Sequence, residues 1–218
     1  MSQPMYHFEE GDGKNKKLLG GKGAGLCLMT QIGLPVPPGF VITTEQCKAY
    51  YSEGRQMPKA VEENLPKYVK YLEEKTGKGF GSEENPLLVS VRSGAAMSMP
   101  GMMDTILNLG LNDKTVNGVA KQTGNERFAW DSYRRFVSLF GKIALDVNDE
   151  LYDKAMNDLK KAKGAVQDTD LDAEAMKELS HTFIAITEKA TGKPFPQCPM
   201  DQLRTAITAV FGSWMGRR

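Results

Sequence analysis

The chain has 218 residues, of which 40% are hydrophobic and 25% are charged, the ordinary balance of a globular protein. Its net charge is +1, which gives no reason to expect a nucleic-acid partner or an acidic membrane surface. No apolar run approaches the roughly 18 residues that span a bilayer, and the N-terminal residues are too polar for a secretory signal, so we expect a soluble cytoplasmic protein with no nucleic-acid or membrane partner.

Short apolar runs alternate with Gly and Pro in the first part of the chain. Residues 34–43 predict a proline-rich turn that leads into a short strand. Thr43 with Gln46 three residues later matches a capping box, which predicts a helix directly after this strand. A second helix is predicted over residues 58–76, where apolar side chains recur at helical spacing: Leu65, Tyr68, Val69 and Leu72.

Two further strands are predicted on either side of a stretch rich in glycine and methionine. Residues 87–93 are apolar and β-branched, which is typical of a buried strand, and Arg92 lies at its end. Along residues 104–110 the side chains would alternate between two faces of a strand, with Ile106, Asn108 and Gly110 on one face and Leu107 and Leu109 on the other. The segment therefore predicts a strand with Ile106 and Leu109 on opposite faces.

Strand signals end there, and the remainder is predicted to be helical, so the pattern as a whole predicts an α+β chain. Asn125 is the predicted N-cap of a long amphipathic helix with an apolar face of Phe128, Tyr133, Phe136, Val137 and Phe140. Further helices are predicted over residues 149–163 and 173–190, the second capped by Asp172. A last helix is predicted to start at Asp201.

The first stretch that can carry chemistry is residues 18–29, with glycines at 20, 21, 23 and 25 around Lys22. Glycines let a backbone approach a ligand closely, and the apolar residues after them can begin a helix whose free N–H groups suit a phosphate. The spacing matches neither the P-loop nor the dinucleotide fingerprint. The stretch therefore predicts either a phosphate site that includes Lys22 or a tightly packed turn with Lys22 in solvent.

The second stretch is residues 91–105. Arg92 offers a rigid fork of donors that suits bidentate contact with a phosphate, and the small residues and methionines after it favour a loop that covers a ligand. The alternative is that Arg92 pairs with a carboxylate and the methionines fill a core.

The remaining candidates are weaker. His7 and His181 have no second ligand at metal-binding spacing, so we expect neither a metal site nor a catalytic triad. Cys27, Cys47 and Cys198 are far apart, which indicates reduced thiols buried as small apolar groups.

Several segments resemble one enzyme family. GGKGAGL (20–26) followed by GLPVPPGFVIT (33–43) looks like the opening of the pyruvate, phosphate dikinase and phosphoenolpyruvate synthase group. SVRSGAAMSMPGMMDTILNLGLND (90–113) resembles the dikinase form of the family motif, because the synthase form continues from VRSS into acidic residues. ERFAWDSYRRFVSLFG (126–141) and FGSWMGRR (211–218) also look dikinase-like, so the similarity covers nearly the whole chain.

This resemblance implies part of an ATP-grasp nucleotide-binding domain. Residues 1–112 would form its first lobe, completed by residues 198–218, and residues 113–197 would form an inserted helical subdomain.

The resemblance also assigns site residues. The family's ATP-phosphate lysine falls on Lys22, and its phosphate-binding arginine, expected to be catalytic, falls on Arg92. The glycine that approaches the terminal phosphate falls on Gly101, in a loop that ends at Asp104. The family's Mg²⁺ ligands would lie C-terminal to Arg218.

For the complete enzyme, the resemblance implies phosphoryl transfer from ATP to a histidine of another domain and to inorganic phosphate, and then to pyruvate. The products would be phosphoenolpyruvate, AMP and diphosphate. The second ATP-grasp lobe, the phosphohistidine domain and the pyruvate-binding barrel are expected outside this sequence, and the complete enzyme is expected to be a homodimer. We therefore expect the chain alone to be inactive and to bind ATP weakly.

Two alternatives stay open. One is a fragment of a phosphoenolpyruvate synthase, which uses water where the dikinase uses phosphate. The other is a short non-catalytic relative that holds a nucleotide for regulation or docks to a full-length dikinase.

Overall fold

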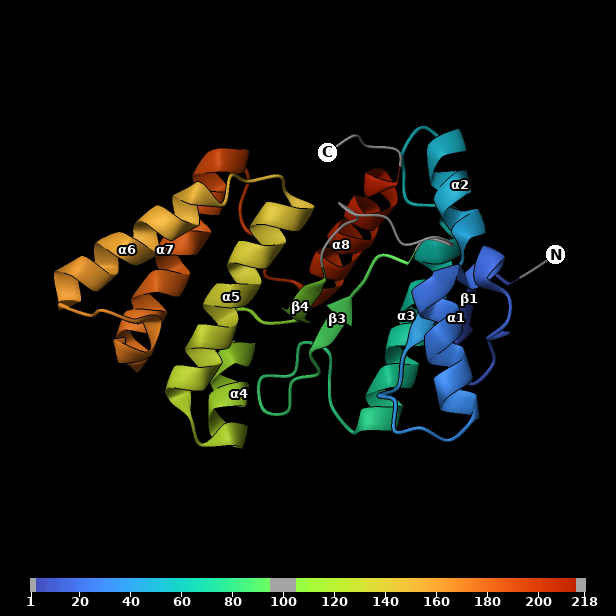
Figure 1. Cartoon of the computed structure of the whole chain (residues 1–218), viewed down its shortest axis with the longest axis horizontal. Coiled ribbons are helices and arrows are strands. Elements are labelled where there is room, and N and C mark those ends of the chain that lie inside the picture. The colour runs from blue at the N-terminus through green and yellow to red at the C-terminus, as the bar shows by residue number, and fades with distance from the viewer. Residues whose placement is uncertain (1–2, 95–104, 215–218) are drawn as a thin grey trace. The chain divides into compact units, whose positions relative to one another are not determined.

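The computed structural model describes residues 3–94 and 105–214, which combine helices with two small sheets as an α+β prediction requires (Figure 1). The chain divides into two compact units. Unit 1 comprises Met1–Gly77, Arg92–Asp104 and Val210–Arg218, and unit 2 comprises Lys78–Val91 and Thr105–Ala209. Among the described residues, no helix combines the length and the hydropathy that crossing a membrane requires.

Unit 1 contains a two-stranded antiparallel sheet of β1 (Met5–His7) and β2 (Phe40–Ile42). The predicted short strand is therefore confirmed. Helix α1 (Lys16–Gln31) lies against β2, where Val41 packs in an apolar cluster with Leu19, Ala24 and Cys27.

Two more helices belong to unit 1. Helix α2 (Thr44–Ser52) follows β2, with Thr43 at its N-cap, but the Thr43 side chain makes no capping hydrogen bond, so the predicted capping box is wrong. Helix α3 (Lys59–Thr76) buries the predicted apolar face and ends at Gly77 in a left-handed conformation. The Tyr68 hydroxyl donates to the Met5 carbonyl at 2.6 Å, which attaches α3 to β1.

The sheet of unit 2 pairs β3 (Val89–Val91) with β4 (Ile106–Leu109) in antiparallel register. The predicted burial of the first strand is wrong, because Ser90 is exposed and its neighbours are only half-buried. The predicted alternation along β4 is also wrong. Asn108 has a φ of 58° at a register shift, and this bulge turns both Ile106 and Leu109 inward.

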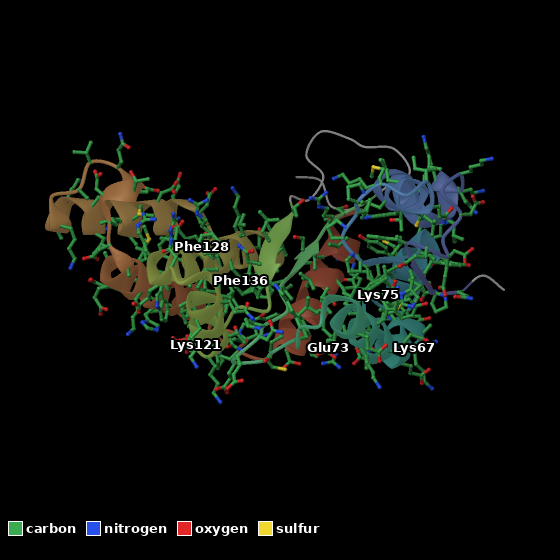
Figure 2. All side chains as sticks on the ribbon, turned by 90° about the horizontal axis from the view of Figure 1, so that it is seen from below. Lys67, Glu73, Lys75, Lys121, Phe128 and Phe136 are labelled. Atoms are coloured by element: carbon green, nitrogen blue, oxygen red, sulfur yellow. The ribbon has the colours of Figure 1, made fainter. Side chains whose placement is uncertain are left out.

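The helices of unit 2 pack around α5 (Glu126–Ala144), which contacts β4, α4 (Thr115–Thr123) and α7 (Ala173–Thr191) (Figure 1). The Asn125 side chain caps α5 as predicted, and it accepts the Phe128 N–H at 2.9 Å. Phe128 itself is 51% exposed, so its predicted place in the core is wrong, whereas Phe136 is fully buried (Figure 2).

Helix α4 has no counterpart in the sequence prediction. It is short, contains Gly118, and starts from an unusual cap in which the Asn112 side chain accepts the N–H groups of both Lys114 and Thr115.

The last helices follow the prediction closely. Helix α6 (Glu150–Lys163) packs on α7, and the Asp172 side chain caps α7 by accepting the Ala175 N–H at 2.9 Å. A short 3₁₀ turn, η1 (Asp168–Asp170), lies between the two helices. Helix α8 (Pro199–Ser213) starts two residues before the predicted Asp201.

Candidate functional site

The glycine-rich stretch forms a helix with a break inside it. Asn15 caps the first turn of α1, where its side chain accepts the Leu18 N–H at 3.1 Å. Helical dihedrals then stop at Gly20, with φ 71° and ψ 165°, a conformation that glycine adopts without steric strain. The helix resumes after Gly20 and continues to Gln31. Helix α1 is therefore a single turn, a break, and a longer second segment.

The break creates a second helix start within α1. Helical hydrogen bonds from the N–H groups of Gly21, Lys22 and Gly23 to the carbonyls four positions earlier would all span Gly20, whose dihedrals are not helical. The break therefore places a second set of helix-start N–H groups, with those of Gly21 and Lys22 first, at the positive end of the second segment, which is the usual setting for anion binding. Lys22 is exposed in this turn and adds a full positive charge.

The second sequence motif lies directly against this break. A Cβ placed on Gly20 would lie 2.7 Å from the carbonyl carbon of Gly94 and would overlap its oxygen. A Cβ placed on Gly94 would lie 3.6 Å from the Cβ of Lys22. The backbone that follows Arg92 therefore packs on the start of the second helical segment, and unit 1 brings the two motifs together.

Arg92 itself is exposed. Within residues 3–94 and 105–214 it forms no ion pair with a carboxylate, so the described residues give no support to the alternative of a structural arginine. Next to it, the Ser93 side chain is 1% exposed, and its hydroxyl has no hydrogen-bond partner in the described part of the chain. The other two predicted site residues, Gly101 and Asp104, lie outside the described residues.

Sequence reasoning did not identify the residues that support the break. The Thr44 hydroxyl donates to the Lys17 carbonyl at 2.7 Å, just before the break. Just after it, a Cβ placed on Gly23 would lie 2.8 Å from Cγ1 of Val41. The tightly packed alternative is thus correct for the glycines at 20 and 23, and it is compatible with an anion site at residues 21 and 22. The available signal was the pair of threonines that directly follows the strand.

The two histidines, His7 in unit 1 and His181 in unit 2, are not part of the break in α1. The His7 ring stacks on Tyr68 and Tyr71, with ring centroids 4.3 and 3.8 Å away, and burial lowers the pKa of His7. His181 is exposed, 4.0 Å from Asp113. Among the residues that the structure describes, no three His, Cys, Asp or Glu side chains are grouped as metal ligands.

The cysteines follow the prediction in part. Cys27 and Cys47 are free and buried, and burial raises the pKa of Cys47 to about 11, so this side chain is a neutral thiol at physiological pH. Cys198 is exposed, so its predicted burial is wrong.

Comparison with known proteins gives a consistent result. The family model described as "Pyruvate phosphate dikinase, AMP/ATP-binding domain" matches residues 16–55 and 53–218. The chain is 67% identical to pyruvate, phosphate dikinase of Entamoeba histolytica over 216 residues, 99% of this chain and 24% of that protein. It is 50% identical to the enzyme of Clostridium symbiosum, over 98% of this chain and 25% of that protein. With the Giardia intestinalis enzyme it shares 51% identity over 93% of this chain and 23% of that protein. The chain thus spans about a quarter of the length of these relatives.

Proposed function

Because the chain belongs to the pyruvate phosphate dikinase AMP/ATP-binding domain family, we propose that it binds the phosphates of ATP where the second segment of α1 meets Arg92. The observation that carries this proposal is the packing of the Gly94 backbone on Gly20. Both positions lack a Cβ, and a side chain at Gly20 would fill the space in which the two motifs meet.

The residues of this site fit a polyphosphate. The N–H groups of Gly21 and Lys22 would donate hydrogen bonds to a negative phosphate oxygen at the positive end of the helical segment. The Lys22 ammonium would supply a mobile charge, whereas the Arg92 guanidinium can hold two oxygens at once. Phosphoryl transfer depends mainly on positioning and on charge stabilisation, so groups of this kind suit the reaction. We propose Lys22 and Arg92 as ATP ligands, Arg92 as the catalytic member, and Gly101 and Asp104 as further parts of the site.

We propose the complete reaction for a full-length enzyme, because this chain spans only about a quarter of the length of its relatives. In it, phosphoryl groups of ATP would pass to a histidine of another domain and to inorganic phosphate, and finally to pyruvate. The relatives named pyruvate, phosphate dikinase support this reaction. Mg²⁺ would accompany ATP as a charge-neutralising ion. The described residues offer no cluster of carboxylates that could hold it.

The domain organisation is proposed on the same basis. Residues 1–112 and 198–218 would belong to one ATP-grasp lobe and residues 113–197 to an inserted helical subdomain, in a cytoplasmic homodimeric enzyme. The partners would be the second lobe, the phosphohistidine domain and the pyruvate barrel. On this proposal the 218-residue chain alone does not turn over ATP at catalytic rates.

An NMR titration of the ¹⁵N-labelled chain with Mg-ATP tests the site, because it also detects weak binding. We expect Mg-ATP to shift the amide resonances of Gly21 and Lys22. Lys22→Ala and Arg92→Ala should each weaken this binding about 10- to 100-fold, since each removes a charged hydrogen bond. Lys67→Ala is the matched control, because Lys67 is an exposed lysine of α3 in the same unit (Figure 2).

Two results would contradict the proposal. One is a folded chain in which saturating Mg-ATP shifts neither amide. The other is a set of variants in which Lys22→Ala and Arg92→Ala bind as well as Lys67→Ala does.

A further inference from the structure

The carbonyl of Lys17 reveals how the break in α1 is maintained. In a continuous helix this carbonyl would accept the Gly21 N–H, four residues later. The dihedrals of Gly20 are not helical, and a carbonyl partly shielded from water is costly to leave without a partner. The Lys17 carbonyl instead accepts the hydroxyl of Thr44, at 2.7 Å. Thr44 therefore takes the place that the Gly21 N–H would occupy in an unbroken helix.

Thr44 is well placed to hold this bond. It is the first residue of α2 and is 8% exposed, so water competes little for its hydroxyl. Its segment also contacts the other side of the break, because Val41 of β2 packs directly on Gly23. The junction of β2 and α2 thus holds α1 on both sides of Gly20, while Gly94 covers Gly20 itself.

We propose that Thr44 is a positioning residue of the ATP site: its hydrogen bond to the Lys17 carbonyl keeps α1 broken at Gly20 and leaves the Gly21 N–H available for a phosphate. This inference rests on the proposed function for its ligand, but the conformational role of Thr44 stands on the geometry alone. Without the hydroxyl, the partner that helix geometry offers the Lys17 carbonyl is the Gly21 N–H, four residues later. Forming that bond would straighten α1 and remove the N–H from the ligand.

The first experiment needs no ligand. Exchange of the Gly21 amide with water is measured by NMR in the unsubstituted chain and in Thr44→Val, Thr44→Ala and Thr44→Ser. We expect Val and Ala at this position to slow exchange of the Gly21 amide about tenfold or more, because they give it a carbonyl partner. Thr44→Ser keeps the hydroxyl and should exchange as the unsubstituted chain does.

Thr30→Val is the matched control. Thr30 also lies in α1 and its hydroxyl also donates to a backbone carbonyl, that of Leu26 at 2.9 Å, but this bond lies within the unbroken segment. Its loss should leave exchange of the Gly21 amide unchanged. If Thr44→Val and Thr44→Ala fold, as their dispersed amide spectra would show, and Gly21 exchanges at the original rate, Thr44 is only a packing residue and the inference is overturned.

The second experiment repeats the Mg-ATP titration with the same variants. We expect Thr44→Val to weaken binding about tenfold, the loss of one well-placed backbone donor, and Thr44→Ser to restore it. If Mg-ATP shifts neither the Gly21 nor the Lys22 amide in the unsubstituted chain, the proposed function fails, and the exchange experiment still decides the role of Thr44. If Mg-ATP binds the unsubstituted chain and Thr44→Val equally well, the inference fails while the proposed function stands.

Discussion

Replacing Gly20 with alanine is the most direct test of the broken helix. Gly20 has a φ of 71°, and its Cα faces the backbone of Gly94. An added Cβ would lie 2.7 Å from the Gly94 carbonyl carbon and closer still to the oxygen. The obstacle is backbone rather than the flexible end of a side chain, so it cannot move aside without moving the residues that follow Arg92.

Two costs add up in this variant. The φ of 71° with a ψ of 165° is a conformation essentially restricted to glycine, and it costs a residue with a side chain about 1–3 kcal/mol. Steric overlap in a packed interior costs about 1–3 kcal/mol more. We therefore expect Gly20→Ala to lower the free energy of unfolding by about 2–6 kcal/mol, out of the roughly 5–15 kcal/mol of a typical domain.

Urea unfolding followed by circular dichroism measures this loss, and Gly25→Ala is its control. Gly25 lies in the same helix, and a Cβ there would meet no atom within 4 Å. Alanine at that position should raise the free energy of unfolding by up to about 1 kcal/mol, because it is the better helix former. A Gly20→Ala chain that is as stable as the original, or that gains stability as Gly25→Ala does, would refute the packing of Gly94 on the break.

Three further changes test other parts of the structure. Gln202 is fully buried, and its side chain accepts the Gly110 N–H at 3.0 Å and donates to two backbone carbonyls. Gln202→Leu should therefore lower the free energy of unfolding in urea by about 2–5 kcal/mol, and an unchanged urea midpoint would contradict this. Asn125→Ala removes the cap of α5 and should cost about 1 kcal/mol in the same assay, with no loss expected from the exposed Lys121→Ala. Burial lowers the pKa of His7 below 6.5, so the unfolded chain binds a proton that the folded chain resists, and the free energy of unfolding should fall as the pH drops below about 6.5. The variant His7→Phe should flatten this dependence, and equal slopes in the two chains would argue against it.

Sequence patterns predicted the structure correctly where the interacting residues lie within one short segment. The side chains of Asn125 and Asp172 cap α5 and α7 as predicted, because an N-cap interacts with residues only three positions away. The apolar face of α3 was likewise predicted correctly from helical spacing.

Local rules failed where a distant neighbour decides the outcome. The bulge at Asn108 places an extra residue of β4 opposite β3. Ile106 and Leu109 are therefore both buried, instead of facing opposite sides of the strand. Phe128 has the correct helical spacing for the core of α5, yet it lies on an exposed side of the first turn. At the end of β2, the hydroxyl that forms a hydrogen bond is that of Thr44, whereas the predicted capping residue, Thr43, makes none among the described residues.

The candidate site shows the same division. The amino-acid sequence by itself indicated two candidate phosphate-binding motifs, the glycines around Lys22 and the strand that ends at Arg92, because residue types and local spacing suit a phosphate, and it left a packed turn and a structural arginine as alternatives. Only the tertiary structure showed that α1 breaks at Gly20 and that Gly94 packs on the break. The reason is physical: a backbone contact between residues far apart in the chain depends on how the intervening strands and helices pack, and no periodicity within either motif records it.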